Sequence, residues 1–455
     1  MSIDALSALD GRYKVSVEPL RHYLSEFALI RERVRVEIEW LIHLAAESSI
    51  PAVRTLTVDE VLFLRRLVSA FHTEQAEEVK AIEKTTNHDV KAVEYWIKQQ
   101  LVDSSIKDVS EWVHFACTSE DINNLAHALM LRGAMQDVML PKAVALIAAV
   151  RELALPLLDA PMLSKTHGQS ATPTTLGKEL AVFVHRWKRQ LVQLESVPFL
   201  GKMNGAVGAF NAHVVAFPDA DWPSIAEQFV TGLGIEYNPL TTQIESHDYM
   251  AELFHAWIRF LTVLLDFDRD IWAYISVGVF KQGTVAGEIG SSTMPHKVNP
   301  IDFENSEANI GIAVSLFEHL AVKLQVSRLQ RDLSDSSAIR AMGTAFGHAL
   351  LSLVAALRGT SKLTADRELM LGELDRNWEV LAEPIQTVMR TEGLERPYER
   401  LKDLTRGQRV DAAGMAAFLD TLELSESALL RLRALRPELY TGLAGQLGRN
   451  ALEQK

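Results

Sequence analysis

The chain has a single cysteine and no excess of positive charge, and each of these deficits excludes a class of protein. One cysteine, Cys117, rules out an intrachain disulfide framework and fits a reducing compartment. It could be a reactive thiol, although a buried small apolar residue is its commoner role. Lysine and arginine together number 46 against 59 acidic residues, which gives a net charge of −13. We therefore expect no nucleic acid partner, because phosphate backbones are bound by basic surfaces.

The sequence also lacks the patterns of membrane and metal-binding proteins. No apolar run approaches the length of a membrane span, and the strongest candidates are interrupted by charges such as Arg259 and Asp266. The amino end has no basic segment followed by an apolar core, so no secretory signal is expected. Metal-ligand spacings of the HExxH or paired-cysteine kind, P-loops and helix-opening GxGxxG patterns are all missing. These absences predict a cytoplasmic protein without a membrane partner or a metal site.

Helical periodicity is the feature that the chain has in abundance. Its 455 residues are too many for one compact core, and 48% of them are hydrophobic. Apolar side chains recur every three or four residues along most of the sequence, which is typical of amphipathic helices. We therefore predict an all-α protein with an N-terminal helical domain over 1–108, a central long-helix bundle over 109–361 and a C-terminal helical domain over 362–455.

The central bundle is expected to consist of about five long helices. Their predicted ranges are 121–157, 174–196, 243–276, 300–324 and 335–359. The intervening stretch 209–218 could hold a short strand. Phe254, Trp257 and Leu261 belong to a wide apolar stripe on one of these helices, and such helices need partners to bury their faces. The excess of apolar helix surface also suggests oligomerisation.

A loop rich in glycine and hydroxyl residues at 287–300 is the most informative stretch. Gly287 and Gly290 loosen the backbone, and three consecutive hydroxyl residues prefer local hydrogen bonds to a ladder. Asn299 and Pro300 are typical of a helix start, with asparagine as the N-cap and proline at the first helical position. The loop would carry hydroxyls, an imidazole and an ammonium group toward a helix N-terminus, which attracts anions. An ordinary surface loop is the alternative.

Residues 290–300, which read GSSTMPHKVNP, resemble the signature loop GSSxMPxKxNP of the fumarase/aspartase superfamily, whose members eliminate fumarate from succinyl compounds. Other words narrow the resemblance to the adenylosuccinate lyase family, and it runs from residues 10–13 to 379–384 and beyond. It implies a three-domain, all-α, fumarase/aspartase-like fold with a central long-helix bundle. It also implies a homotetramer whose active sites are shared, because each forms where three subunits meet.

Eliminating fumarate from a carbon–nitrogen bond requires a base, an acid and a stabilised carbanion. By resemblance, Ser291 is the general base, although a serine hydroxyl would have to act as an alkoxide stabilised by loop amides and a cation. From the residues alone, His88 or His167 would be the expected base. Lys297 and Asn299 suit the developing dianion, one as a charge and one as a hydrogen-bond donor. Their ordinary roles are a solvated lysine and a helix cap.

His167 is the general acid by the same resemblance. It lies in THGQSATP at 166–173, which is similar to the family's THGQPATP, and Ser170 in place of the proline is expected to loosen the following turn. Glu304 follows Lys297 by seven residues, and in the superfamily a glutamate at this spacing pairs with the catalytic histidine. A carboxylate would favour imidazolium, which suits an acid. The ordinary role of Glu304 is a favourable charge near a helix N-terminus.

Other sequence motifs contain further residues that are predicted to contact the substrate. Asn87, His88 and Asp89 resemble the family's H-D-V segment. Thr118 and Ser119 open the word TSEDINN and are expected, by resemblance, to bind the succinyl carboxylate. The ordinary roles of these two words are a helix start and an N-cap with an acidic first turn. The remaining predicted contact is the loop amide of Gln243.

A basic group near residue 335 is expected to bind phosphate. Ser336 and Arg340 are four residues apart, so they share a face at the start of a helix, and Arg331 precedes that helix. Two arginines and a serine can form a phosphate cradle, although an exposed charged face is the ordinary alternative. Family members without a nucleotide substrate would not need this group. Together with Arg12 and Tyr13, it favours succinylated purine nucleotides over argininosuccinate, aspartate or malate.

The resemblance therefore predicts fumarate release from adenylosuccinate, which gives AMP, and from succinylaminoimidazole carboxamide ribotide. The chemistry needs no cofactor. Two alternatives stay open. The chain could be a sister lyase, such as an argininosuccinate lyase, or a non-catalytic nucleotide-binding homologue that has kept the fold.

Overall fold

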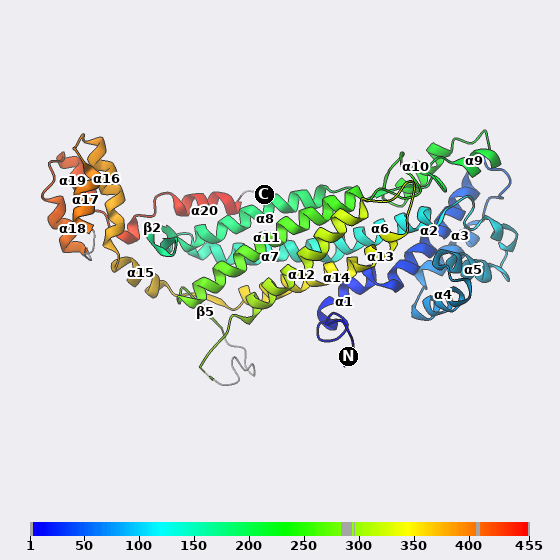
Figure 1. The fold of residues 1–455 in the computed structure, drawn as a ribbon, viewed down its shortest axis with the longest axis horizontal. Helices are drawn as coiled ribbons and strands as arrows, with labels where there is room; N and C mark the ends of the chain where they lie inside the picture. The colour runs from blue at the N-terminus through cyan, green and yellow to red at the C-terminus, as the bar shows by residue number, and fades with distance from the viewer. Residues whose placement is uncertain (1–2, 284–293, 295, 406–409, 454–455) are drawn as a thin grey trace. The chain divides into compact units, whose positions relative to one another are not determined.

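The computed structural model describes residues 3–283, 294, 296–405 and 410–453, and helices dominate them (Figure 1). The predicted all-α class is confirmed. The described chain divides into two compact units. Unit 1 comprises 1–143, 190–261 and 308–352, and unit 2 comprises 144–189, 262–307 and 353–455. The predicted three-domain division at residues 108 and 361 stays a prediction.

Most of the described helices lie entirely within unit 1 or entirely within unit 2. Those of unit 1 are α1 (Lys14–Leu24), α2 (Glu26–Ala46), α3 (Val58–Ser69), α4 (Thr73–Thr86), α5 (Asp89–Leu101), η1 (Lys107–Trp112), α6 (Ser119–Ala134), η2 (Met135–Met139), α9 (Asn211–Ala216), α10 (Trp222–Gly232), α13 (Ser334–Ala338) and η4 (Ile339–Ala341). Those of unit 2 are η3 (Leu155–Leu157), α15 (Arg367–Asp375), η5 (Trp378–Leu381), α16 (Ala382–Thr391), α17 (Pro397–Thr405), α18 (Ala412–Leu419), α19 (Glu426–Arg433), η6 (Pro437–Leu439) and α20 (Ala444–Glu453).

Five of the described helices contribute residues to both units. They are α7 (Leu140–Ala154), α8 (Leu176–Ser196), α11 (Asp248–Ser276), α12 (Ile301–Leu324) and α14 (Met342–Thr360). The strands are short and pair as β1 (Pro161–Thr166) with β2 (Gln169–Thr175), β3 (Leu200–Gly201) with β4 (Glu236–Tyr237), and β5 (Phe280–Gln282) with β6 (Leu363–Ala365). The five predicted long helical stretches are thus confirmed. The first consists of α6, η2 and α7 in succession, and the last consists of α13, η4 and α14.

Helix α2 is covered on several sides in unit 1, where α3, α4, α5 and α6 pack against it (Figure 1). It begins at Ser25, whose side chain accepts the Ala28 N–H at 3.2 Å. Trp40, which is fully buried, lies on this helix together with the buried charged side chains of Arg33 and Glu37. Buried charges are costly unless they are paired, so each of these two must find a partner on a neighbouring segment.

A buried ion pair fixes the start of α6. The side chains of Asp121 and Lys202 are both fully buried, and Lys202 Nζ lies 2.9 Å from Asp121 Oδ1. Asp121 also accepts the backbone N–H groups of Thr118 at 2.8 Å and Asn204 at 3.0 Å. The helix start with the TSEDINN motif is therefore held by a loop that belongs to the same unit but comes much later in the sequence.

Each unit has its own aromatic core. In unit 1, Phe317 of α12 lies between Phe254 of α11 and Phe346 of α14, with ring centroids 5.3 and 4.9 Å away. In unit 2, Phe267 of α11 packs against Trp187 of α8 with ring centroids 5.3 Å apart. A separate cluster in unit 2 is formed by η5 and by α16 to α19 (Figure 1), and its buried members include Trp378, Leu381, Ile385, Met389 and Leu432.

Two segments differ from the sequence prediction. Residues 209–218 contain helix α9 rather than a strand, and its His213 is buried edge-on against Trp222, with ring centroids 4.7 Å apart. Residues 161–175 form the β1–β2 hairpin, and no strand was predicted there. In the first case tertiary packing outweighs a run of valine and phenylalanine that suits a strand.

The helical stretch Ser334–Thr360 corrects another expectation. By length and composition it could cross a membrane, whereas no run of that length was expected. However, 61% of its most apolar window is buried inside the protein, as in a core helix of a soluble protein. Among the described residues it is the one helix that passes this test, and it is weak support for a membrane span.

Candidate active site

Arg331 is the centre of one group of predicted site residues in unit 1. Its Nη1 atom lies 2.7 Å from Oε1 of Glu120, a buried side chain in the first turn of α6. The same Nη1 atom lies 3.5 Å from Oε1 of Gln243, whose Nε2 donates to the carbonyl of Ala206 at 2.9 Å. Glu120 of the TSEDINN motif and Gln243 therefore meet at the guanidinium group of Arg331.

The word at 87–89 forms the junction between α4 and α5. Asn87 ends α4 in the left-handed conformation, with a φ of 50°, and His88 caps α5 by accepting a first-turn N–H at 3.2 Å. The His88 side chain is exposed, while Asp89 turns inward. Asp89 Oδ2 accepts a hydrogen bond from Arg33 at 2.7 Å and lies 3.6 Å from Nη2 of Arg340. Asp89, a predicted substrate contact, therefore lies next to Arg340 of the predicted phosphate cradle.

A buried arginine that sequence reasoning missed joins these two groups. Arg33 donates through Nη2 to Asp89 and through Nε to Oδ1 of Asn123, the latter at 2.8 Å. Asn123 Nδ2 then donates to Oε1 of Glu120 at 2.6 Å. Burial acts to raise the pKa of Asp89, but the Arg33 charge and hydrogen bonds outweigh it and the pKa is lowered. Asp89 is therefore held as a carboxylate.

Arg340 lies in the turn η4 that follows the short helix α13. Its Nη1 atom is 2.8 Å from Oε2 of Glu26, and the side chain is about half exposed at 46%. Ser336, inside α13, donates its backbone N–H to Asp335 Oδ1 at 2.7 Å. Arg340 therefore has carboxylates on one side and keeps access to solvent on the other, as an arginine that binds an anionic ligand requires.

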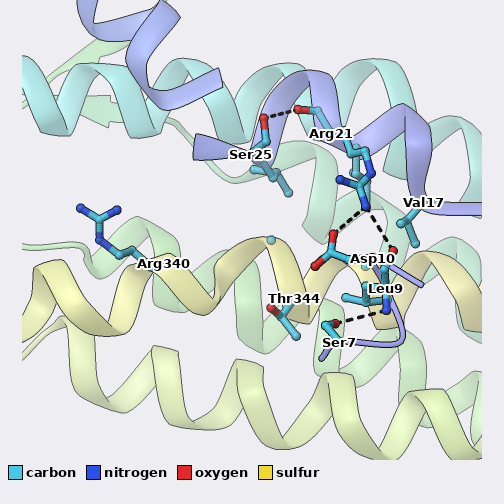
Figure 2. Close-up of a pocket in the computed structure, with 12 residues that line it drawn as sticks. Ser7, Leu9, Asp10, Val17, Arg21, Ser25, Arg340 and Thr344 are labelled. Atoms are coloured by element: carbon cyan, nitrogen blue, oxygen red, sulfur yellow. Dashed lines mark hydrogen bonds and ion pairs between the residues drawn. The ribbon is translucent and has the colours of Figure 1, made fainter. Parts of the chain in front are cut away.

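A cavity of about 210 Å³ opens beside Arg340 and Thr344, between α14 and the amino-terminal segment (Figure 2). Arg21 closes part of it. Its Nη2 atom donates to Asp10 Oδ1 at 2.6 Å and to the carbonyl of Leu9 at 3.2 Å (Figure 2). The turn at residues 9–10 is therefore braced by an ion pair from α1.

Arg12 and Tyr13 follow directly after this braced turn. Tyr13 is the N-cap residue of α1 and packs against the cluster of Leu9, Val17 and Leu351. The Arg12 guanidinium carbon lies 5.9 Å from the centre of the Tyr13 ring, and the Arg12 side chain is exposed. Apolar contacts hold the phenol, and the arginine stays available.

Thr118 and Ser119 open α6, which confirms their ordinary role as a helix start with an acidic first turn. Both are half-buried. Cys117, one residue earlier, lies 3.8 Å from the Met203 sulfur, and burial raises the pKa of its thiol well above the ordinary value. A packed, protonated cysteine is therefore favoured over a reactive thiol.

His167 lies at the tip of the β1–β2 hairpin in unit 2. Thr166 and Gln169 pair across a two-residue turn, and both turn residues have positive φ, 54° for His167 and 74° for Gly168. This is the geometry of a type I′ turn, which usually has asparagine and glycine. Histidine is one of the few non-glycine residues that tolerate positive φ. The strained turn presents an exposed imidazole at a fixed place.

The hairpin is tied to other parts of unit 2. Lys165 of β1 forms an ion pair with Glu373 of α15, with a distance of 2.6 Å between Nζ and Oε1. Thr172 of β2 donates from its hydroxyl to Glu383 of α16. Ser170 lies in β2 opposite Lys165 in the register. The imidazole is therefore carried by a braced element.

The signature loop is described only at its carboxyl end. Ser291 lies outside the described residues. Lys297 is exposed, and its backbone N–H donates to the carbonyl of Met294 at 3.0 Å. Asn299 is half-buried, and α12 begins at Ile301, one residue later than predicted. The helix start is close to its predicted place.

Glu304 does not pair with His167 among the described contacts within one chain. Its Oε1 atom accepts a hydrogen bond from Trp272 Nε1 at 3.1 Å, and the side chain is exposed. Asp302, two residues earlier, is buried and forms ion pairs with Arg358 at 2.5 Å and Lys362 at 3.1 Å. Asp302 therefore anchors the helix start, and Glu304 faces outward.

Known protein families match most of the chain. A family model described as lyase matches residues 11–315, and one described as adenylosuccinate lyase C-terminal matches residues 327–441. The structure of a fumarate lyase from a Mesorhizobium species superposes with a TM-score of 0.78 at 18% identity, covering 96% of this chain and 98% of that one. The 3-carboxy-cis,cis-muconate lactonizing enzyme from Pseudomonas putida superposes with a TM-score of 0.72 at 21% identity, covering 95% and 96%.

These matches define the class: the fold is that of the fumarase/aspartase superfamily, and the enzyme is a lyase. Adenylosuccinate lyase from Escherichia coli is 55% identical over 444 residues, which cover 97% of each chain. The one from Haemophilus influenzae is 52% identical over 447 residues, which cover 98% of each. The chain belongs to the adenylosuccinate lyase family.

Proposed function

We propose that the chain catalyses β-elimination of fumarate from adenylosuccinate, giving AMP, and the same elimination from succinylaminoimidazole carboxamide ribotide. The observation that carries the proposal is the linked pair of guanidinium groups, Arg331 and Arg340, in a chain that resembles adenylosuccinate lyases along its full length. A nucleotide substrate carries a phosphate that such groups bind well. The reaction would run in the cytoplasm and needs no cofactor.

The phosphate is assigned to Arg340 and Arg331, with Ser336, Arg12 and Tyr13 as further contacts. The half-exposed Arg340 side chain supports this role, because a bound anion can complete a coordination that Glu26 only half fills. Gln243, Thr118 and Ser119 are assigned to the succinyl and purine parts, with Asn87, His88 and Asp89 next to them.

The reacting groups are assigned to unit 2. His167, as imidazolium, would protonate the leaving nitrogen, and Ser291 would remove the proton beside the carboxylate. Lys297 and Asn299 would stabilise the carbanion that forms between these steps. The exposed position of His167 on a braced, strained turn supports its role, since an acid must be held in place and still reach the substrate.

We infer that His167 and Glu304 pair between subunits of a homotetramer. Within one chain the described contact of Glu304 is to Trp272, and both predicted partners are exposed. Apolar side chains exposed on the long helices, among them Val182, Ile312 and Val322, offer surface for such an assembly.

Fumarate release from purified protein tests the proposed function. Adenylosuccinate is expected to yield fumarate and AMP, while argininosuccinate, supplied in parallel, is expected to yield nothing. Release from argininosuccinate alone would assign the chain to a sister activity. A folded tetramer that binds AMP and releases fumarate from neither compound would make it a binding protein.

Mixing two inactive variants tests the shared site. His167→Ala and Ser291→Ala proteins are each expected to be inactive, and exchange of their subunits is expected to restore part of the activity. If exchange is verified by native mass spectrometry and no activity returns, the sites do not combine these residues from different subunits.

A further inference from the structure

Arg33 divides one guanidinium group between two segments that are far away in the sequence. Its Nη2 atom donates to Asp89 in α5 and its Nε atom donates to Asn123 in α6, which lie 56 and 90 residues away. The side chain is 3% exposed, so its charge is held almost entirely by these partners. A buried arginine of this kind is expensive to place and fixes the geometry of whatever it binds.

The first arm of this contact has a fixed polarity. Arginine can only donate, so the Asn123 amide must turn its Oδ1 atom toward Arg33 and its Nδ2 atom away. Nδ2 then donates to Oε1 of Glu120 at 2.6 Å, and this oxygen also receives Arg331 Nη1 at 2.7 Å. Asn123 therefore holds in place the carboxylate oxygen of Glu120 that binds Arg331.

The second arm ends at Arg340. Asp89 Oδ2 lies between Arg33, at 2.7 Å, and Arg340, at 3.6 Å, while its Oδ1 accepts the Val90 N–H at 2.9 Å. His127, near the same buried group, adds no positive charge, because burial and the Arg33 charge lower its pKa to about 3. The Asp89 carboxylate is thus shared by one buried and one half-exposed guanidinium group.

We propose that Arg33 is a positioning residue for substrate binding. It does not touch the substrate; through Asp89 it holds Arg340, and through Asn123 and Glu120 it holds Arg331. Both arginines of the proposed cradle are therefore oriented by one side chain from α2. The inference rests on the proposed function, in which these arginines bind the nucleotide.

Kinetics of Arg33→Lys and Arg33→Met test the inference. Lysine keeps the charge but cannot form the two-armed fork, and methionine removes both. Both variants are expected to raise KM for adenylosuccinate by roughly tenfold to a hundredfold, the size of losing a charge-assisted hydrogen bond, with kcat within about threefold of wild type. KM for the dephosphorylated compound succinyladenosine is expected to rise much less.

A merely structural role predicts a different result. Loss of stability alone would lower the melting temperature and the active fraction, so that kcat falls for both substrates and KM does not change. That outcome, or an equal KM increase for both substrates, overturns the proposal. If wild-type protein releases no fumarate from adenylosuccinate, the proposed function fails first, and AMP binding by the same variants still tests Arg33.

Two further variants complete the test. Arg54 also links two carboxylates in unit 1, Glu60 at 2.8 Å and Asp108 at 2.7 Å, although its side chain is 37% exposed, so Arg54→Lys is the control and is expected to leave KM unchanged. Asn123→Asp replaces the donor that faces Glu120 with an acceptor and keeps a partner for Arg33. It breaks the Arg331 arm alone, and it is expected to raise KM even if Arg33→Met does not fold.

Discussion

The predicted site residues of unit 1 and those of unit 2 are held in opposite ways. In unit 1, a connected series of hydrogen bonds and ion pairs links Asp89, Arg331 and Arg340, and its inner members are buried. In unit 2, His167 and Glu304 are exposed, one on a hairpin tip and the other on the first turns of a helix. The residues proposed for binding therefore contact one another within one chain, whereas His167 and Glu304 face outward, which fits their proposed pairing between subunits.

Ser291→Ala is the strongest way to test the chemical side of this contrast. Turnover is expected to fall by about a hundredfold to ten-thousandfold, the contribution of a general base, while AMP binding by unit 1 residues stays intact. Stopped-flow fumarate release and isothermal titration with AMP measure the two quantities. Turnover near the wild-type level would remove the serine from the base role.

Arg340→Ala tests the binding side. Its KM for adenylosuccinate is expected to rise roughly tenfold to a hundredfold, because a charge-assisted contact to phosphate is lost. Steady-state kinetics with adenylosuccinate and succinyladenosine separate the phosphate contribution from the rest. Equal effects on the two substrates would contradict the assignment of Arg340 to phosphate.

The close packing beside Arg340 predicts a smaller effect on stability. A Cβ added at Gly343 of α14 would lie 2.7 Å from the Leu24 carbonyl oxygen, which is backbone and cannot easily move. Gly343→Ala is expected to cost about 1–3 kcal/mol, as overpacking does. Gly311→Ala, in an open position on α12, is the matched control and is expected to stabilise by roughly 0.5–1 kcal/mol. Urea unfolding of both proteins compares them, and equal shifts would show that the α1–α14 approach is not tight.

The smallest expected effect concerns pH. Nδ1 of His114 lies 2.6 Å from Oε1 of Glu37 in unit 1. Burial acts to lower the His114 pKa, but Glu37 raises it above the ordinary 6.5 overall. A histidine whose pKa is higher in the folded than in the unfolded protein stabilises the fold. This contribution is fully present below the unfolded pKa and is lost as the pH rises through the folded pKa. The melting temperature should therefore decline above pH 6.5 by differential scanning fluorimetry, and less steeply in His114→Gln. An identical slope would assign that decline to other groups.

Sequence periodicity could predict the long helices because their apolar stripes are wide and regular. It could not predict α9, where valines and phenylalanines suited a strand and burial of His213 against Trp222 decided for helix. The β1–β2 hairpin was missed because its turn uses histidine and glycine rather than the usual asparagine and glycine. In both places the local pattern was ambiguous and tertiary contacts made the choice.

The site residues could be predicted only where they belong to recognisable sequence motifs. Arg33 stands in none. On a helix pattern, an arginine is expected on the solvated face, and its partners Asp89 and Asn123 are too far along the sequence for spacing to reveal them. The acidic residues Asp89 and Glu120, which belong to separate motifs, gave the one hint in the sequence that a buried cation lies between them. Roles for Ser291 and Glu304 remain predictions from the resemblance.

The buried pair of Asp121 and Lys202 bears on how the chain acquires its shape. The N–H groups of Asn204 and Gly205 that also bind Asp121 come from 83 and 84 residues later. Until that later loop has been synthesised and closed, the first turn of α6 has a carboxylate without its cation, and closing so long a loop is slow. A truncated chain that ends before residue 200 should therefore be unable to fold by itself, because the emerging polypeptide must wait for the loop at 202–205.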